Sequence, residues 1–178
     1  MLRHALHHPH TVPGLVLIEP VFFAAAQGTP EFAQNEIDEG AVHEALRRGD
    51  TELAARKFLA LNEGSPDWAR LPAQARALMA RQITLITAMN AGILQDSGGL
   101  LAPGLMEGFD VPVLLILGGR TSAIFHATAR ALAARLPRSE IRVIDEAGHM
   151  APISHPDQTA RCIGHWMART GQAAPSTV

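Results

Sequence analysis

Three short, nearly continuous runs of apolar residues mark the chain. They are GLVLIEP at 14–20, VPVLLILGG at 111–119 and IRVID at 141–145. An uninterrupted apolar run of this length is typical of a strand buried on both faces, as in a parallel sheet. The first run closes with proline, the second with a glycine pair, and the third leads into an Ala-Gly-His-Met turn. We therefore expect three buried strands.

The segment between the first two runs, residues 28–108, has helical spacing instead. Its apolar positions include Val42, Leu46, Leu53, Phe58 and Leu61, and then Met79, Ile83, Ile86, Met89 and Ile93. The first set predicts two short amphipathic helices separated at Gly49, with Asp50 or Thr51 capping the second. The second set predicts a longer helix, which the DSGGL sequence at 96–100 closes.

Further helices are expected at 1–8, 124–137 and 156–169, the last beginning with proline at its favoured first position. The elements then run helix, strand, helical insertion, strand, helix, strand, helix. Such alternation is typical of an α/β fold, here a partial parallel sheet of about three strands flanked by helices. The sequence predicts a core from residues 1–27 and 109–170, an inserted helical segment at 28–108 and a flexible tail at 171–178.

The composition narrows the class of protein. The 178 residues are 47% hydrophobic, carry a net charge of −2 and include one cysteine, Cys162. Such a chain can bury a core, presents no basic surface to nucleic acid or anionic lipid, and cannot form an internal disulfide. No apolar run approaches the roughly 20 residues of a membrane span, and no signal-peptide layout is present. We therefore expect a cytoplasmic protein.

Candidate chemistry follows the predicted strands, at the edge where parallel sheets bind ligands. Glu19 follows the first strand, Thr121 the second and His149 the third. With strands about 4.8 Å apart, Glu19 and His149 start roughly 10 Å apart, and the loop of the histidine can close that distance. A carboxylate bonded to one ring nitrogen fixes the tautomer and turns the other nitrogen toward a nucleophile.

Two parts of the sequence resemble the α/β-hydrolase family. VPVLLILGGRTSAIF, then a helix and IRVIDEAGHMAPISHPDQ, resembles the closing third of that fold, and HALHHPHTVPGLVLIEP resembles the segment after its nucleophile elbow. The resemblance covers roughly residues 2–22 and 110–167, and it implies that the helical segment at 28–108 is a lid. It identifies the chain as the C-terminal part of an α/β-hydrolase fold.

The same resemblance implies that His149 is the catalytic base. The family's usual acid follows the second strand, where this chain has the uncharged Thr121. Some members place the acid one strand earlier, where this chain has Glu19. We therefore assign Glu19 as the acid and keep Asp145 as the second candidate. In the alternative reading, Glu19 only caps the start of the lid and His149 is a structural histidine.

The nucleophile is missing from the pattern, because no G-x-S-x-G motif occurs. The serines are Ser65, Ser97, Ser122, Ser139, Ser154 and Ser176. The DSGGL sequence around Ser97 comes nearest, but it follows a helix rather than a buried strand, and Cys162 falls within a helix. We therefore expect that the nucleophile segment precedes Met1, so that the chain is truncated and inactive alone.

No cofactor or metal is predicted. The histidines at 4, 7, 8 and 10 straddle a helix end and a proline, which does not suit converging zinc ligands, and histidine is favoured at a helix C-terminus.

Two functions stay open. One is a serine-type hydrolase of an ester, a lactone or a related small apolar substrate. The other is a non-catalytic binding or assembly module derived from a hydrolase. In the family, the strand matching GLVLI at 14–18 lies beside the nucleophile strand, so its exposed N–H and C=O groups favour pairing with another chain.

Overall fold

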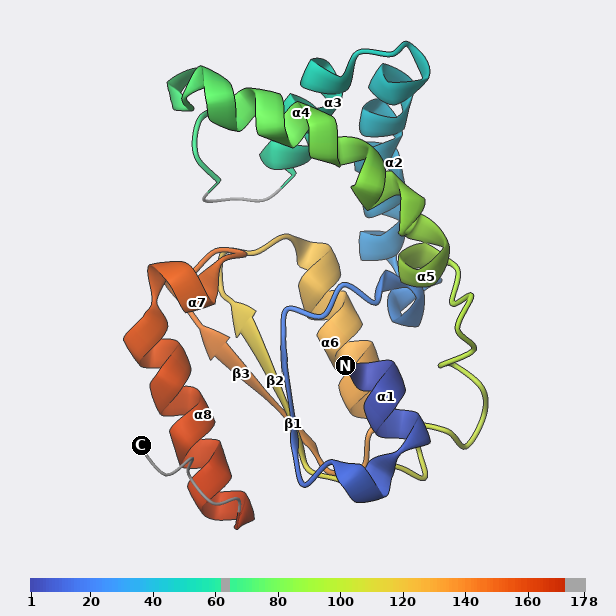
Figure 1. Ribbon diagram of the computed structural model, residues 1–178. Coiled ribbons are helices and arrows are strands. Elements are labelled where there is room, and N and C mark those ends of the chain that lie inside the picture. Colours follow the sequence, from blue (N-terminus) through green and yellow to red (C-terminus); the bar gives the residue numbers. More distant parts are fainter. Residues whose placement is uncertain (62–64, 172–178) are drawn as a thin grey trace.

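The computed structural model describes residues 1–61 and 65–171 (Figure 1). One sheet contains the strands β1 (Leu15–Ile18), β2 (Val113–Gly118) and β3 (Ser139–Ile144), in that spatial order. Both pairings are parallel, with Leu15 opposite Val113 and Val113 opposite Ser139. The predicted partial parallel sheet is therefore confirmed. Of the predicted tail at 171–178, only Gly171 is among the described residues, and the others lie outside them.

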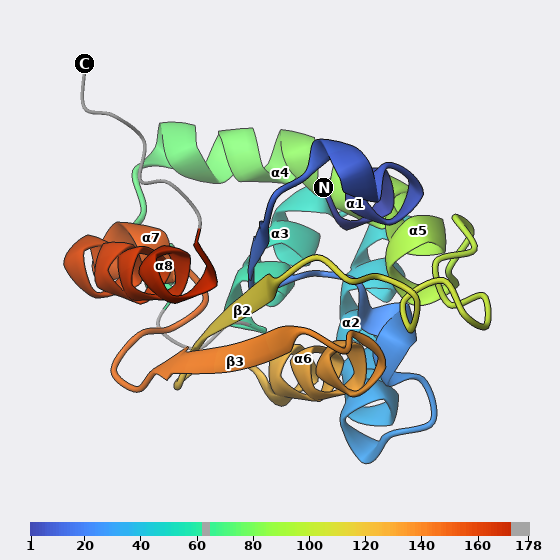
Figure 2. The ribbon, with the colours of Figure 1, turned by 90° about the horizontal axis from the view of Figure 1, so that it is seen from below.

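Helices cover both faces of the sheet, as Figures 1 and 2 show. The helices α1 (Leu2–His7) and α6 (Ala123–Arg135) lie on one face, and α8 (Pro156–Thr170) lies on the other. A short helix, α7 (Ala151–Ser154), connects β3 to α8. The helix α8 begins at Pro156, the residue predicted from the sequence.

The two faces follow from the alternation of side chains along each strand. On one face, Leu115 of β2 belongs to a cluster with Leu2 of α1 and Leu132 of α6. On the other face, Ile116 belongs to a cluster with Trp166 of α8. All six residues of β2 are buried, as the continuous apolar run predicted.

The third strand differs from the prediction of a fully buried strand. Only Ile144 in β3 is fully buried, and Val143 is 44% exposed. The reason is position, because β3 lies at an edge of the sheet and has a strand neighbour on one side only within the described residues. An edge strand accommodates charged side chains, and Glu140 pairs here with Arg169 of α8.

The segment between β1 and β2 is helical, as predicted. Its helices are α2 (Pro30–Arg47), α3 (Thr51–Ala60), α4 (Ala73–Ala88) and α5 (Asn90–Leu94). Three 3₁₀ turns complete the described elements of the chain: η1 (Pro9–Thr11), η2 (Phe23–Ala26) and η3 (Trp68–Arg70). The Asp50 side chain caps α3 by accepting the N–H of Leu53 at 2.9 Å, which decides between the two predicted caps.

The helix α2 begins earlier than the apolar spacing indicated. Thr29 caps it through a hydrogen bond from the N–H of Phe32, at 3.2 Å, and Pro30 occupies its first turn. These residue types in this order are a standard helix start. The result is one helix of 18 residues that runs from the core into the insertion.

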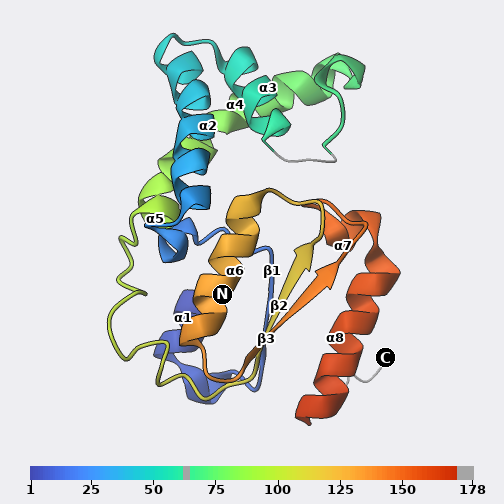
Figure 3. The ribbon, with the colours of Figure 1, turned by 180° about the vertical axis from the view of Figure 1, so that it is seen from behind.

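The insertion has a small apolar core of its own. Its buried residues include Val42 of α2, Ala54 of α3 and Ile83 of α4. Phe58 and Ile86, which are partly buried, pack against this cluster. Figures 1 and 3 show these helices beyond the ends to which the strand arrows point. Of the predicted apolar stripe, Ile83 is buried but Met89 is 60% exposed. None of the described helices is both long enough and apolar enough to cross a membrane.

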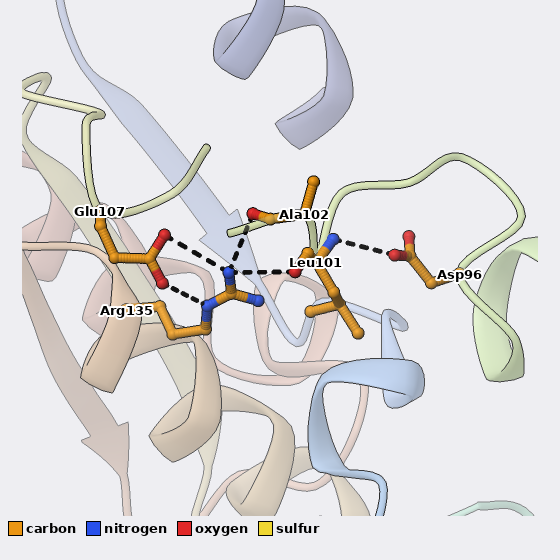
Figure 4. Close-up of polar contacts among 5 residues, drawn as sticks. All are labelled: Asp96, Leu101, Ala102, Glu107 and Arg135. Atoms are coloured by element: carbon orange, nitrogen blue, oxygen red, sulfur yellow. Dashed lines mark hydrogen bonds and ion pairs between the residues drawn. The ribbon is translucent and has the colours of Figure 1, made fainter. Parts of the chain in front are cut away.

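The chain returns from the insertion through a segment held by hydrogen bonds to side chains (Figure 4). Asp96 accepts the N–H groups of Leu100 and Leu101 at 2.7 and 2.8 Å. Arg135 of α6 donates to the carbonyls of Leu101 and Ala102, each at 3.2 Å, and pairs with Glu107 at 2.7 Å. The hydrogen bond and charge of Arg135, together with hydrogen bonds from the backbone of Glu107 and Gly104, lower the pKa of Glu107 from 4.5 to about 2.

Candidate active site

Glu19 stands directly after β1 with its carboxylate buried. Its side chain is 2% exposed, and its backbone has a φ of +44°. The N–H of Glu19 donates to the carbonyl of Ile116 at 2.9 Å, and Oε1 accepts the N–H of Gly118 at 2.8 Å. Both bonds tie the residue to β2, the neighbouring strand. The carboxylate therefore has a fixed position at the edge where the strands end.

His149 contacts this carboxylate from the loop after β3. Its Nδ1 lies against Oε2 of Glu19 in a close hydrogen bond. Because a carboxylate only accepts hydrogen bonds, the proton in this bond belongs to Nδ1. The imidazole is 30% exposed, so Nε2 is the nitrogen that stays available to a reacting group. The structure thus brings together the two residues that were expected to meet at this edge.

The loop reaches Glu19 because glycines let it pass close to β2. A Cβ at Gly118 would lie 2.5 Å from the carbonyl oxygens of both Ala147 and Gly148. The loop is fastened by hydrogen bonds from the N–H of Gly119 to Ile144 and from the N–H of Arg120 to Ala147, each 2.9 Å long. The glycine pair that ends β2 therefore positions the histidine as well as ending the strand.

Aromatic rings support the imidazole. The ring of Phe125 in α6 lies 4.7 Å from the ring of His149, between centroids, with an interplanar angle of 34°. Phe23 packs edge-on against Phe125 at 5.1 Å. Both phenylalanines are buried. The imidazole is therefore restrained by Glu19 at one nitrogen and by Phe125 on one face.

A pocket of about 100 Å³ lies beside His149, between the sheet edge and the helical insertion. Its wall is mainly apolar and combines residues of the core with residues of the insertion. The lining residues are Val21, Phe23, Asn35, Glu39, Phe58, Leu61, Ile86, Asn90, Ile93, Ser122, Ile124, Phe125 and His149. A concave, largely apolar site with a few polar groups is the usual form of a small-molecule site.

Apart from His149, sequence reasoning did not identify the polar residues of this pocket. Asn35 and Glu39 lie on α2, Asn90 on α5, and Ser122 at the start of α6. The position of Ser122, one residue after Thr121 at the end of a strand, was a signal that could have been used. The residues of the insertion had no such signal, because helical periodicity does not show which polar residues of a helix face a neighbouring element.

The other candidates from the sequence form no hydrogen bond or ion pair with His149 among the described residues. The side chain of Thr121 is buried, and its Oγ1 has no hydrogen-bond partner among the described residues. Asp145 is exposed and lines a different depression, beside Cys162 of α8. The structure therefore brings Glu19, rather than Asp145, to His149.

The histidines near the N-terminus remain close to one another at the surface. The rings of His4 and His8 lie 4.9 Å apart between centroids, and His4 contacts Thr11. Within residues 1–61 and 65–171, no group of three or more His, Cys, Asp or Glu side chains has an arrangement that could hold a metal ion.

Known structures share this fold. A membrane phospholipase A, described as a bacterial virulence factor, matches 97% of this chain over 54% of its own, with a TM-score of 0.59 and 20% identity. MenH from S. aureus matches 96% of this chain over 66% of its own, with a TM-score of 0.55 and 20% identity. At this identity the two structures bear on the fold alone.

The sequence comparisons agree with the fold. A curated relative, the pimeloyl-[acyl-carrier protein] methyl ester esterase of Serratia marcescens, is 27% identical over 167 residues, which is 92% of this chain. The chain spans 64% of the length of that relative. The sequence pattern that defines the alpha/beta hydrolase family matches residues 1–162, nearly the whole chain. The resemblance noted from the sequence is thus confirmed, and the chain belongs to the alpha/beta hydrolase family.

Proposed function

We propose that this chain carries the histidine and the acid of an ester-hydrolysing site. His149 is the general base, and Glu19 positions it. The observation that carries the proposal is the contact of Nδ1 of His149 with Oε2 of Glu19 at the wall of an apolar pocket. Membership of the hydrolase family supports the reaction class, and the name of the Serratia relative supports an ester as substrate.

The proposed proton path needs only one ring nitrogen. Nε2 of His149 accepts the hydroxyl proton of the nucleophile as its oxygen attacks the ester carbonyl, and the Glu19 carboxylate stabilises the resulting imidazolium. Nε2 then gives this proton to the departing alcohol. In the second half of the reaction, a water molecule gives a proton to Nε2 and attacks the acyl group on the serine. Nε2 then returns this proton to the serine oxygen, which releases the carboxylic acid and restores the nucleophile. Glu19 takes no proton in this scheme.

The nucleophile in this proposal is a serine on a segment outside the 178 residues, because these residues contain no G-x-S-x-G. It follows that the 178 residues alone should hydrolyse no ester. The substrate is a small apolar ester or lactone, which the mainly apolar pocket supports. Residues 28–108 form the lid over that pocket, and residues 1–27 and 109–170 form the hydrolase core.

The test combines DNA sequence with kinetics. The DNA upstream of Met1 is translated, and an in-frame segment with G-x-S-x-G is expressed together with the chain and assayed with a chromogenic ester. We expect turnover that His149→Ala abolishes. Asp145→Asn is the matched control, since Asp145 is exposed and lines a different depression from His149. Turnover that survives His149→Ala contradicts the proposal.

A second candidate is a non-catalytic binding or assembly module. The observation that favours it is the outer edge of β1, which pairs with β2 only within the described part of the chain. Stop codons in every upstream frame, together with a stable oligomer of the 178 residues, would support this function over the first.

A further inference from the structure

We infer that the pocket beside His149 selects an apolar ligand that ends in an ammonium group, and that Glu39 is the residue that selects it. The inference rests on the proposed function only in identifying this ligand with the substrate. The charge preference of the pocket is a separate property, which binding alone can measure.

The polar residues that the insertion contributes to the pocket are Asn35, Glu39 and Asn90, whereas Ser122 and His149 belong to the core. The apolar wall on this side includes Phe58 of α3, Leu61 at the end of α3 and Ile86 of α4. Asn35 and Glu39 stand one turn apart on α2, about 6 Å along the helix axis. The helix α2 runs away from α6 and the sheet into the insertion (Figure 1). Glu39 is therefore farther along α2 from the core than Asn35.

Hydrogen bonds within this group leave acceptors for a ligand. Nδ2 of Asn35 donates to Oε1 of Glu39 at 3.2 Å. Nδ2 of Asn90 donates to Nε2 of His43 at 3.0 Å. Oε2 of Glu39 and the amide carbonyls of Asn35 and Asn90 then have no partner among the described residues, and the possible donors that remain are the second N–H of each amide and the Ser122 hydroxyl. A carboxylate and amide carbonyls accept hydrogen bonds and donate none.

The charge of Glu39 is not balanced by a neighbouring cation. Among the described residues, no Arg, Lys or His forms an ion pair with it. Other glutamates on α2 do have such partners, since Glu44 pairs with Arg47 and Arg48.

The adjoining surface adds more negative charge. Glu31 and Asp38 line a second depression, which shares Asn35 and Ser122 with the pocket. Glu31 is paired with Arg130, but Asp38 forms no ion pair within the described residues. A partly buried carboxylate that lacks a cation attracts an ammonium and repels a second carboxylate, and this difference gives specificity.

The test measures binding of three ligands that share an eight-carbon chain: octylammonium, 1-octanol and octanoate. Isothermal titration calorimetry is performed at neutral pH and low salt on the 178-residue protein, on Glu39→Gln and on Glu36→Gln. Glu36 is the matched control because it lies on the same helix but is exposed and lines a different depression. Circular dichroism establishes that each variant retains the helical content of the parent.

We expect octylammonium to bind about tenfold or more tightly than octanoate, with octanol between them. Glu39→Gln should remove most of this ratio, and Glu36→Gln should keep it. Equal affinities, tighter binding of octanoate, a ratio that survives Glu39→Gln, or no binding of any of the three overturns the inference.

Failure of the proposed function gives a different result. A preserved preference in a protein whose turnover does not depend on His149 would refute the catalytic assignment alone. A lost preference in a His149-dependent esterase would refute the ammonium selectivity alone.

Discussion

Glu19 is held in a backbone conformation that its residue type rarely adopts. A positive φ in a residue with a side chain costs about 1–3 kcal/mol and persists only where the surroundings enforce it. The φ of +44° is enforced here by the hydrogen bonds of Glu19 to Ile116 and Gly118. Such strain concentrates at functional sites. The conformation of Glu19 therefore supports a role beyond capping the start of the insertion.

The first prediction concerns Glu19→Gln. The amide of glutamine can donate to Nδ1 of His149, so the proton of the imidazole should move from Nδ1 to Nε2. Nitrogen NMR of the histidine ring should show this change in the 178-residue protein. In a complete enzyme, the analogous change in a serine triad lowers turnover about 10⁴-fold. An unchanged tautomer, or near-normal turnover, would return Glu19 to a structural role. Asp145→Asn should change neither the tautomer of His149 nor the turnover.

The second prediction concerns Gly118→Ala. The added Cβ would meet the carbonyls of Ala147 and Gly148 at 2.5 Å, so the loop of His149 must move. We expect a loss of about 1–3 kcal/mol in the free energy of unfolding, measured with urea, and a shifted His149 ring signal. Gly164→Ala in α8 is the control, since nothing lies within 4 Å of its Cβ, and it should raise stability by about 0.5–1 kcal/mol. A Gly118→Ala protein as stable as the parent would show that the loop is loosely held.

At the scale of elements, the sequence predicted what depends on local pattern. The continuous apolar run of β2 and the proline at the start of α8 were sufficient to predict those two elements from the sequence. The early start of α2 could also have been found, because Thr29 and Pro30 are a cap and a first-turn residue. The exposure of β3 could not, because it depends on the position of the strand at the sheet edge. The same holds for Glu39, whose side of α2 depends on how the insertion packs.

The third prediction concerns the segment that joins the insertion to β2. The pKa of Glu107 is lowered to about 2, chiefly by its hydrogen bond from Arg135, so the folded state binds this proton less readily than the unfolded state. The stabilisation is therefore fully present above about pH 4.5 and is lost as the pH falls toward 2. Urea unfolding of the protein and of Glu107→Gln should give a stability difference that shrinks across this range.

A double mutant provides the control for that experiment. In an Arg135→Met background, Glu107→Gln should have a smaller pH-dependent effect, because the largest cause of the lowered pKa is gone and only the backbone hydrogen bonds remain. A pH-dependent difference of undiminished size in this background would assign the effect to groups other than Arg135. Because Glu107 is exposed, added salt should weaken the difference in the parent protein.

At the scale of the whole molecule, the meeting of Glu19 and His149 was predictable, because both follow parallel strands and so lie at the same edge. The pocket was not, because its wall combines the core with an insertion whose placement leaves no local signal. The cytoplasmic location stays a prediction. So does the truncation expected from the missing G-x-S-x-G motif; the chain spans 64% of the length of its Serratia relative.

The fourth prediction concerns self-association through β1. The N–H groups of Leu15 and Glu19 point toward β2, so those of Val16 and Ile18 point outward by alternation, and no strand covers them within the described residues. An uncovered edge favours pairing with a second chain. Sedimentation velocity should therefore show an oligomer of the 178-residue protein. Val16→Pro removes an outward donor without removing a bond to β2 and should favour the monomer, whereas Leu17→Pro should disrupt the sheet itself. A monomeric parent with a sharp, cooperative thermal transition would show that this edge is satisfied without a partner.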